Sequence, residues 1–275
     1  MTRLTMCVCL LALTLFALAP QAKADYIVLE DGNSMAAIDT ASDFGMYYWL
    51  VDGVKQLKQQ WFWYRVGSDT PQSAINTLPN ASYAVSDTNG DGKNDVANLK
   101  YSNDAFEIVV KYSLNGSPAG SLQSDMGEQI QINNRSGRAI DDFHFFQYSD
   151  FDLGSLTGGQ TVQFVTPGKV EQTGGGTTLS ETVVVPNASR HEASSFPTTL
   201  LALRGSTPYD LNNADSATGD ATWAFQWDFN LAASGAGSSF GISKDKLLSP
   251  VVPEPASILL MGGILLLVAR KFRKA

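Results

Sequence analysis

The chain has 275 residues, of which 17% are charged, and its formal net charge at pH 7 is −8. Six of its 19 basic residues lie in the two terminal segments, so the body between them is more acidic still. Such a body is repelled by phosphate backbones, which argues against nucleic-acid binding. Both cysteines, Cys7 and Cys9, fall in the apolar N-terminal stretch, so the body can form no disulfide and no cysteine-based metal or redox site.

Residues 1–24 have the pattern of an export signal. Arg3 provides a positive start, residues 6–19 are apolar, and the segment that ends at Ala24 is a small-x-small cleavage site. We therefore predict that the export machinery carries the chain out of the cytoplasm and that cleavage leaves Asp25 as the first residue.

Between residues 25 and 248 the sequence predicts one domain of many short strands and no amphipathic helix. The clearest alternations of apolar and polar residues cover 106–114 and 223–231. Further strands are expected at 46–51, 54–57, 129–133, 142–148, 161–165, 182–185, 199–203 and 240–243, with glycine-rich loops between several of them. Antiparallel strands without helices must bury their apolar faces against one another, so the predicted fold class is an all-β, jelly-roll-like antiparallel β-sandwich.

A tight hairpin is predicted at Asp52-Gly53. Residues of this kind adopt the positive φ angles that a two-residue type I′ turn requires. The turn places Val51 beside Val54, and Trp49 beside Gln56.

Aromatic residues occupy both faces of a strand at 61–64. If one face belongs to the core, Trp61 and Trp63 on the other face offer flat rings that could stack on sugars. The alternative is a central strand covered on both sides, and we favour it because aromatic side chains mostly occupy cores.

A calcium loop is predicted at residues 87–95. Its five ligands are Asp87, Asn89, Asp91, the backbone carbonyl of Lys93, and Asp95. Gly92 stands where such a loop must turn sharply, and the spacing lets the oxygens converge on a hard cation. The pattern resembles the loops of EF-hands, dockerins and β-propeller repeats, although Asn98 replaces the usual bidentate Glu. We expect a weakly held structural Ca²⁺ in a hairpin between strands at 83–86 and 96–101, and the alternative is an acidic turn without an ion.

The two histidines give no clear catalytic motif. His144 lies in an apolar strand pattern, which favours a hydrogen-bonded structural role. A Ser-His-Asp triad could combine His191 with Ser194 or Ser195, but no Gly-x-Ser-x-Gly elbow supports it.

Four aspartates lie close together in the sequence: Asp141, Asp142, Asp150 and Asp152. Glycoside hydrolysis needs two carboxyl groups at a suitable separation in space, which the sequence does not give. We interpret Asp150-Phe151-Asp152 as a solvated turn or as a second cation site.

Residues 249–275 carry three features in fixed order: Pro253-Glu254-Pro255, an apolar stretch at 258–269, and a basic tail at 270–274. A helix over 256–269 is about 21 Å long, which is short for the ~30 Å hydrocarbon core of a membrane. This end resembles the PEP-CTERM sorting signal, which Pro253, Glu254 and Pro255 match residue by residue. The resemblance implies a single short transmembrane helix, recognition by an exosortase, and delivery to the cell envelope, the cell surface or the extracellular matrix.

The predicted function is that of an exported, non-catalytic surface or matrix protein, stabilised by calcium and associated with extracellular polysaccharide, as in a biofilm. The alternative is a secreted carbohydrate-active hydrolase that uses paired carboxylates. A cleft with two carboxylates of perturbed pKa, ringed by Trp or Tyr, would favour the hydrolase. A continuous sandwich without such a cleft would favour the non-catalytic protein.

Overall fold

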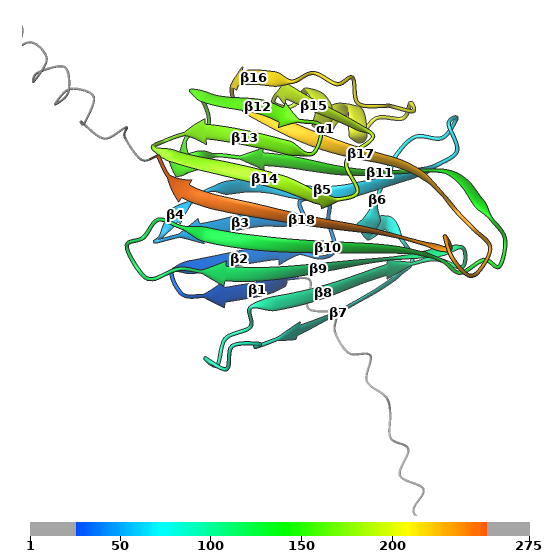
Figure 1. The fold of residues 1–275 in the computed structure, drawn as a ribbon, viewed down its shortest axis with the longest axis horizontal. Coiled ribbons are helices and arrows are strands. Elements are labelled where there is room, and N and C mark those ends of the chain that lie inside the picture. Colours follow the sequence, from blue (N-terminus) through cyan, green and yellow to red (C-terminus); the bar gives the residue numbers. More distant parts are fainter. Residues whose placement is uncertain (1–25, 252–275) are drawn as a thin grey trace, which may run out of the picture.

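The computed structural model describes residues 26–251 and shows two antiparallel β-sheets with very little helix (Figure 1). Sheet A has the strand order β1-β2-β3-β5-β11-β17-β15, with β4 beside β3 and β6 beside β5. Its strands are β1 (Tyr26–Asp31), β2 (Ser34–Asp39), β3 (Met46–Val51), β4 (Val54–Lys55), β5 (Leu57–Val66), β6 (Ser73–Ala74), β11 (Ile140–Phe151), β15 (Arg190–Ser195) and β17 (Ala221–Leu231).

Sheet B has the order β16-β12-β13-β14-β18-β10-β9-β8-β7. Its strands are β7 (Asn80–Ser86), β8 (Val96–Ser102), β9 (Phe106–Gly116), β10 (Ser124–Asn134), β12 (Gln160–Thr166), β13 (Lys169–Gly174), β14 (Thr177–Val185), β16 (Ser216–Gly219) and β18 (Ser239–Pro250). Two 3₁₀ turns, η1 (Ile75–Thr77) and η2 (Leu153–Ser155), and the helix α1 (Thr198–Leu203) complete the described elements.

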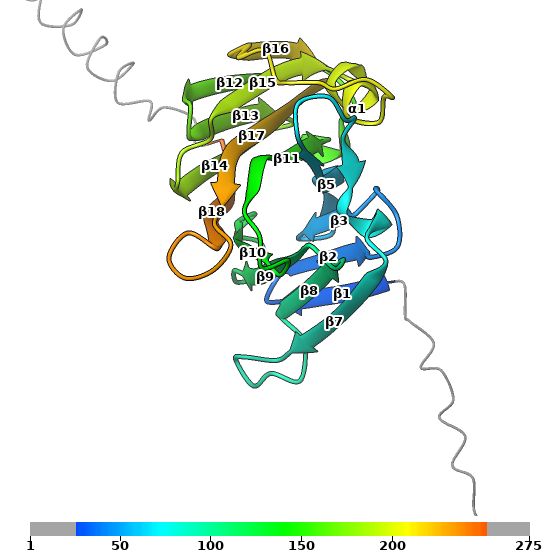
Figure 2. The same cartoon turned by 90° about the vertical axis from the view of Figure 1, so that its right-hand side faces the viewer.

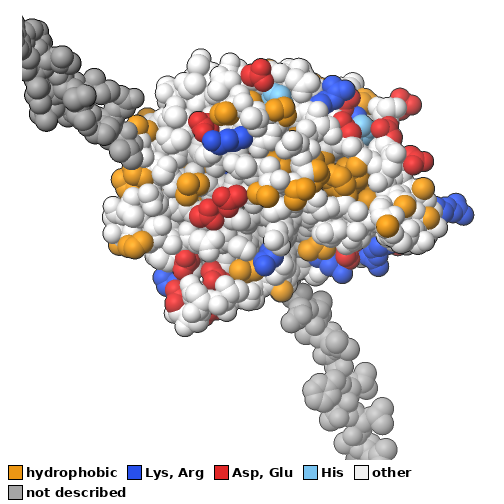
Figure 3. Space-filling model, viewed as in Figure 1, with side chains coloured by type: hydrophobic (Ala, Val, Ile, Leu, Met, Phe, Trp, Pro, Cys, Tyr) orange, Lys and Arg blue, Asp and Glu red, His pale blue; other side chains and the backbone are white. Residues whose placement is uncertain are grey.

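Aromatic side chains fill the space between the two sheets, which form two curved layers when viewed along the strands (Figure 2). Phe229 of sheet A stacks on Phe240 of sheet B, with ring centroids 3.8 Å apart. Tyr64 of sheet A meets Phe106 of sheet B edge to face, with centroids 5.2 Å apart. The opposite face of sheet B is open to solvent and is the face seen in Figure 3.

The predicted antiparallel β-sandwich is confirmed at the level of two packed sheets. The strands predicted at 106–114 and 223–231 lie within β9 and β17. Each sheet contains nine strands, more than the eight of a jelly roll, and most neighbouring strands follow one another in the chain. The jelly-roll comparison therefore does not extend to the strand order.

The hairpin predicted at Asp52-Gly53 is also confirmed. Asp52 has φ 49° and Gly53 has φ 77°, so both turn residues are in the left-handed region, as a type I′ turn requires. Val51 pairs with Val54, and the backbone N–H of Gln56, directly after β4, donates to the carbonyl of Trp49 at 2.8 Å.

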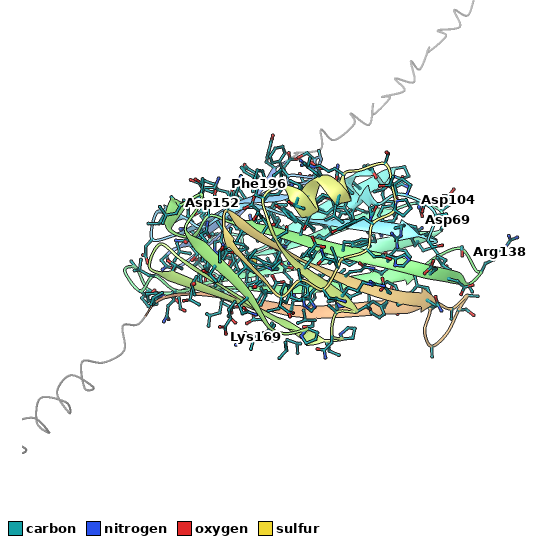
Figure 4. All side chains as sticks on the ribbon, turned by 90° about the horizontal axis from the view of Figure 1, so that it is seen from above. Asp69, Asp104, Arg138, Asp152, Lys169 and Phe196 are labelled. Carbon is teal, nitrogen blue, oxygen red and sulfur yellow. The ribbon has the colours of Figure 1, made fainter. Side chains whose placement is uncertain are left out.

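The strand predicted at 199–203 is wrong, because this segment is the helix α1. A strand would place Leu201 and Leu203 on one face, but Leu201 is 60% exposed and Leu203 is buried. Leu200 is also buried, and residues three apart share one face of a helix. The helix packs on β15 and β17, on the side of sheet A away from β18 (Figure 4).

The export signal at 1–24, the cleavage point at Ala24 and the tail from residue 252 lie outside the described residues. Within residues 26–251, no helix is long and apolar enough to span a membrane. The body predicted at 25–248 corresponds to the sandwich, whose last strand runs on to Pro250.

Four charged side chains meet inside the sandwich, between the two sheets. They are Glu128, Glu181, Lys244 and Lys246, and all are at most 2% exposed. The Lys244 ammonium donates to both carboxylates, at 3.2 Å in the case of Glu181, and Lys246 lies 3.4 Å from Glu181. Two lysines thus neutralise two glutamates, which gives the buried group no net charge.

Neighbouring polar side chains complete this buried ion network. The Gln60 amide donates to Glu128 at 2.7 Å, and the Gln147 amide donates to Glu181 at 2.8 Å. Burial raises the pKa of Glu128, but the charges of Lys244 and Lys246 outweigh it and hold this pKa at about 2. Buried charges are tolerated only when paired and hydrogen-bonded in this way.

Candidate functional site

Three aspartates meet where β11 ends, on the face of sheet A that points away from sheet B. Successive strand residues face opposite sides of a sheet. Phe151 points into the core, where its ring stacks on Trp223 with centroids 5.2 Å apart, so Asp150 points outward. Asp152 follows directly after the strand, on the α1 side of the sheet (Figure 4). Asp220 joins them from the residue before β17.

The carboxylates of this cluster are close enough to influence one another's ionisation. One oxygen each from Asp150, Asp152 and Asp220 lies within 4.8 Å of the others. Asp150 is 0% exposed, and neither of its carboxylate oxygens accepts a hydrogen bond from a described residue. The Lys58 ammonium lies 3.4 Å from one Asp150 oxygen and 3.7 Å from the centroid of the Phe196 ring. Lys58 is thus the ammonium next to the buried carboxylate of Asp150.

This environment favours a protonated carboxyl group. Burial raises the pKa of Asp150 to about 7, against the opposing charge of Lys58 and with a further contribution from Asp152 and Asp220. Burial also raises the pKa of Asp152. A carboxyl that titrates near neutral pH can give up and take back a proton under ordinary conditions, as a general acid must.

Aromatic side chains border the cluster. Tyr148 precedes Asp150 by two residues and shares its face of β11. Burial, together with the charge of Asp150, raises the pKa of the Tyr148 hydroxyl. The Tyr148 ring meets Trp63 edge to face, with centroids 6.4 Å apart. Tyr148 therefore lies beside two carboxyls of perturbed pKa, and Trp63 packs against its ring.

A divalent cation is the other species that such a cluster could hold. Among the described residues, Asp150, Asp152 and Asp220 are the group of acidic side chains whose oxygens are mutually close enough to share an ion. Carboxylate oxygens are the ligands that Ca²⁺ and Mg²⁺ prefer. The interpretation of 150–152 as a solvated turn is wrong, because Asp150 is completely buried.

The other two aspartates of the sequence group are remote from this cluster. Asp141 and Asp142 lie at the opposite end of β11, roughly 25 Å from Asp150 at about 3.3 Å per strand residue. The strand therefore divides the four aspartates into two pairs.

Both histidines lie beside aspartates, and His144 has the hydrogen-bonded surroundings predicted for it. Its Nδ1 lies 2.7 Å from Asp228 and its Nε2 lies 3.0 Å from Asp142. His191 contacts Asp215 at 2.8 Å, whereas the Ser194 hydroxyl bonds to Thr199 at 2.7 Å. His191 and Ser194 are three residues apart in β15 and so point to opposite faces, which rules out a triad between them.

The two tryptophans considered for sugar stacking are not available to a ligand from solution. Trp61 is 0% exposed and Trp63 is 1% exposed. The Trp61 indole N–H donates to Asn76 at 3.0 Å, and its ring meets Tyr101 edge to face. The alternative, a strand covered on both sides, describes them correctly.

The acidic loop at 87–95 connects β7 and β8, as predicted for a hairpin. The Asp87 carboxylate accepts backbone N–H groups from Gly90 at 2.7 Å and Gly92 at 2.8 Å, and these bonds lower its pKa. Asp95 accepts the N–H of Thr88 at 2.9 Å. The loop thus uses these carboxylates to hold its own turns, and calcium binding there stays a prediction.

No pattern in the sequence predicts that Asp220 and Lys58 lie beside Asp150. Asp220 lies 70 positions after Asp150, and only the pairing of β17 with β11 brings it there. Lys58 reaches the same face because the register between β5 and β11 shifts at this point. A bulge of this kind redirects a side chain and is common beside functional sites.

The sequence matches no protein-family model, and it matches no curated protein. The fold resembles that of a bacterial glucoamylase solved with acarbose, with a TM-score of 0.54 and 8% identity over 84% of this chain and 32% of that one. The Slr1438 protein of Synechocystis sp. gives a TM-score of 0.48 and 11% identity over 82% of this chain and 96% of that one. A GH92 α-mannosidase of Bacteroides thetaiotaomicron, solved with mannoimidazole, gives a TM-score of 0.41 and 10% identity over 83% of this chain and 31% of that one.

The chain thus spans about a third of the glucoamylase that it resembles. At these identities the likeness describes the fold. It nevertheless corrects the prediction of a non-catalytic protein that is not an enzyme, because this fold is found in part of a glucoamylase. Of the condition set above for the alternative, a carbohydrate-active hydrolase, the aspartate cluster supplies the two carboxyls of perturbed pKa and a neighbouring tyrosine, Tyr148.

Proposed function

We propose that this protein is a carbohydrate-active hydrolase whose catalytic groups are the carboxyls at the end of β11. The observation that carries the proposal is the buried Asp150 carboxyl, with its pKa of about 7, beside Asp152 and Asp220. The fold shared with a glucoamylase supports a role on carbohydrates. The activity of the whole glucoamylase is not transferred by this likeness.

In the proposed reaction, protonated Asp150 gives its proton to the glycosidic oxygen while the bond from that oxygen to the anomeric carbon breaks. Asp152, which is 8% exposed and lies on the solvent side, attacks the anomeric carbon as a carboxylate and forms a glycosyl ester. Water then cleaves the ester and returns a proton to Asp150. Lys58, whose side chain is 34% exposed, covers Asp150 and is the group that a sugar must displace.

The spacing of the carboxylates selects between the two stereochemical courses. Inverting enzymes keep their carboxyl groups about 6.5–9.5 Å apart to leave room for a water molecule, whereas retaining enzymes hold them about 5–5.5 Å apart. Oxygens within 4.8 Å of one another correspond to the retaining arrangement. We therefore expect products with the same anomeric configuration as the substrate.

The test is hydrolysis of a panel of α- and β-linked glucans and mannans by the mature protein, followed by NMR of the products. We expect release of reducing ends with retained configuration. Asp150→Asn should lower the rate by about 10²–10⁴-fold, the usual contribution of a general acid. Asp141→Asn, an exposed position at the far end of the same strand, should leave it unchanged. Inverted products, or equal rates for both variants, would refute the mechanism.

We also propose that the loop at 87–95 binds Ca²⁺ weakly, as its ligand spacing predicts. Millimolar calcium should then raise the melting temperature by a few degrees, because an ion that binds the folded form stabilises it. Asp91→Ala should remove this shift, and Asp104→Ala, an exposed position outside the loop, should not. Identical melting temperatures in calcium and in chelator would show that the loop is an acidic turn.

Four further proposals rest on the sequence. They are export, sorting by an exosortase through Pro253, Glu254 and Pro255, transient anchoring in the membrane, and association with extracellular polysaccharide. They are compatible with a hydrolase that acts outside the cytoplasm. A secreted enzyme of this kind would meet polysaccharide substrates at the cell surface.

A further inference from the structure

A groove of about 440 Å³ lies on the solvent face of sheet B, on the opposite side of the sandwich from the aspartate cluster. It runs over β9, β10 and β18 and reaches the end of β14, where Val185 forms one border. Figure 3 looks onto this face, where charged side chains are sparse among uncharged ones. The groove is therefore separate from the proposed catalytic site.

Backbone forms much of the groove floor. Ile130 and Ile242 line it although their side chains are buried on the core side of the sheet. Gly241, which pairs with Gln131 on the neighbouring strand, adds no side chain to the floor. Gly127 lies further along β10 on the same face of the sheet.

The fold itself does not require either glycine. Neither has a positive φ. A Cβ at Gly127 would meet no described atom closer than 3.8 Å. One at Gly241 would come close only to the flexible end of Gln131, at 3.1 Å, and would lie at an ordinary contact distance of 3.9 Å from the Ile130 carbonyl oxygen. Glycine in a strand interior lowers stability, and it commonly marks a place where a ligand approaches the backbone closely. Gly241 thus keeps the floor of the groove open.

The walls of the groove combine uncharged hydrogen-bonding groups with apolar surface. Gln129, Gln131 and Asn98 offer amide donors and acceptors, and Ser243 offers a hydroxyl. Val109 adds an apolar contact next to them. Sugars present the complementary set, since their hydroxyls both donate and accept and their ring C–H faces are apolar.

The charges around the groove favour a neutral ligand. Among the described residues that line it, Lys111 is the charged one. Asp125 and Asp245 lie beyond it on the same face, and burial together with Asp125 raises the pKa of Asp245 to about 6. At neutral pH these carboxylates and the acidic body repel a polyanion.

We propose that this groove binds a neutral oligosaccharide chain and holds a polysaccharide on the protein at a distance from the catalytic carboxylates. The sugar class rests on the proposed function, but the groove can be tested without it. An anchoring site of this kind would raise the local concentration of polymer near the enzyme.

The test uses the full mature protein in affinity electrophoresis and co-sedimentation with neutral glucans: amylose, cellulose and a β-1,3-glucan. We expect at least one of them to retain the protein. Gly241→Leu fills the floor, and the double variant Gln129→Ala/Gln131→Ala removes amides from one wall, so each should weaken binding at least tenfold. Thr173→Leu, an exposed position on β13 outside the groove, is the matched control and should bind like the wild type.

Anionic alginate is tested beside the neutral glucans. The proposal would be overturned if none of the glucans retains the protein, if alginate alone retains it, or if both groove variants bind like the wild type. The double variant keeps the test valid if Gly241→Leu does not fold. Asp150→Asn separates this inference from the proposed function, because it should still bind the glucan. If the wild type binds through the groove but hydrolyses nothing, the groove stands and the catalytic proposal fails.

Discussion

Glu128→Ala is expected to lower the free energy of unfolding by about 3–5 kcal/mol, the usual cost of removing one partner from a buried ion pair. The variant leaves Lys244 and Lys246 inside the sandwich with the single carboxylate of Glu181. Domains of this kind are stable by about 5–15 kcal/mol in total, so the loss should move the urea midpoint far down or unfold part of the population. Equilibrium urea unfolding at pH 7 measures it.

Glu107→Ala is the matched control for Glu128→Ala. Glu107 pairs with Lys100 at 2.7 Å on the outer face of sheet B, where the Lys100 side chain is 50% exposed. An exposed pair of this kind contributes about 1 kcal/mol at most. Equal losses in the two variants would mean that the buried ion network does not stabilise the sandwich as described.

The same network predicts a loss of stability in acid. The pKa of Glu128 is about 2 in the folded protein and lies below its ordinary value of 4.5. The carboxylate therefore contributes stability above pH 4.5, and this contribution disappears as the pH falls toward 2. Wild-type protein should lose stability across this window more steeply than Glu128→Ala.

Asp150→Asn is expected to lower the rate of hydrolysis by about 10²–10⁴-fold and yet to stabilise the protein at pH 8. The pKa of Asp150 is about 7 when folded, compared with 3.8 ordinarily, so the folded state binds this proton more tightly. Stability from this group is fully present below pH 3.8 and is lost as the pH rises through 7. A rise of the Asp150 pKa from 3.8 to about 7 corresponds to roughly 4 kcal/mol, which is the upper limit for the gain in stability of the uncharged variant.

Urea unfolding of wild type and Asp150→Asn at pH 5 and pH 8 checks this expectation. The difference in stability should grow with pH, whereas Asp141→Asn should give no such trend. A gain in stability at the expense of activity is common at catalytic sites that hold strained or buried charges. A constant difference at both pH values would show that Asp150 ionises normally.

Local patterns in the sequence predicted much of the sandwich. The alternation at 223–231 gives β17, and the Asp52-Gly53 pair gives the hairpin, because both depend on residues that are close in the chain. The prediction of a strand at 199–203 is wrong because five mostly apolar residues carry too little periodicity to separate a strand from a helix. Packing on β15 and β17 decides for the helix.

The buried ion network and the aspartate cluster depend on pairing between strands that are far apart in the sequence, so local patterns could not predict them. Lys244 and Lys246 lie between Ile242 and Leu248 on the core face of β18. Lysine rarely occupies such a buried position. Only the approach of Glu128 and Glu181 from two neighbouring strands makes their burial tolerable. The aspartate cluster likewise depends on strand pairing over long distances in the chain, which spacing alone does not reveal.

Asp150 is expected to hold a proton near neutral pH. ¹³C NMR of protein labelled at the aspartate carboxyl carbons measures this directly, with Asp150→Asn used to assign the resonance. We expect the Asp150 carboxyl to titrate with a pKa of about 7, well above the ordinary value of 3.8. A carboxyl signal for Asp150 that titrates near pH 4 would contradict the account.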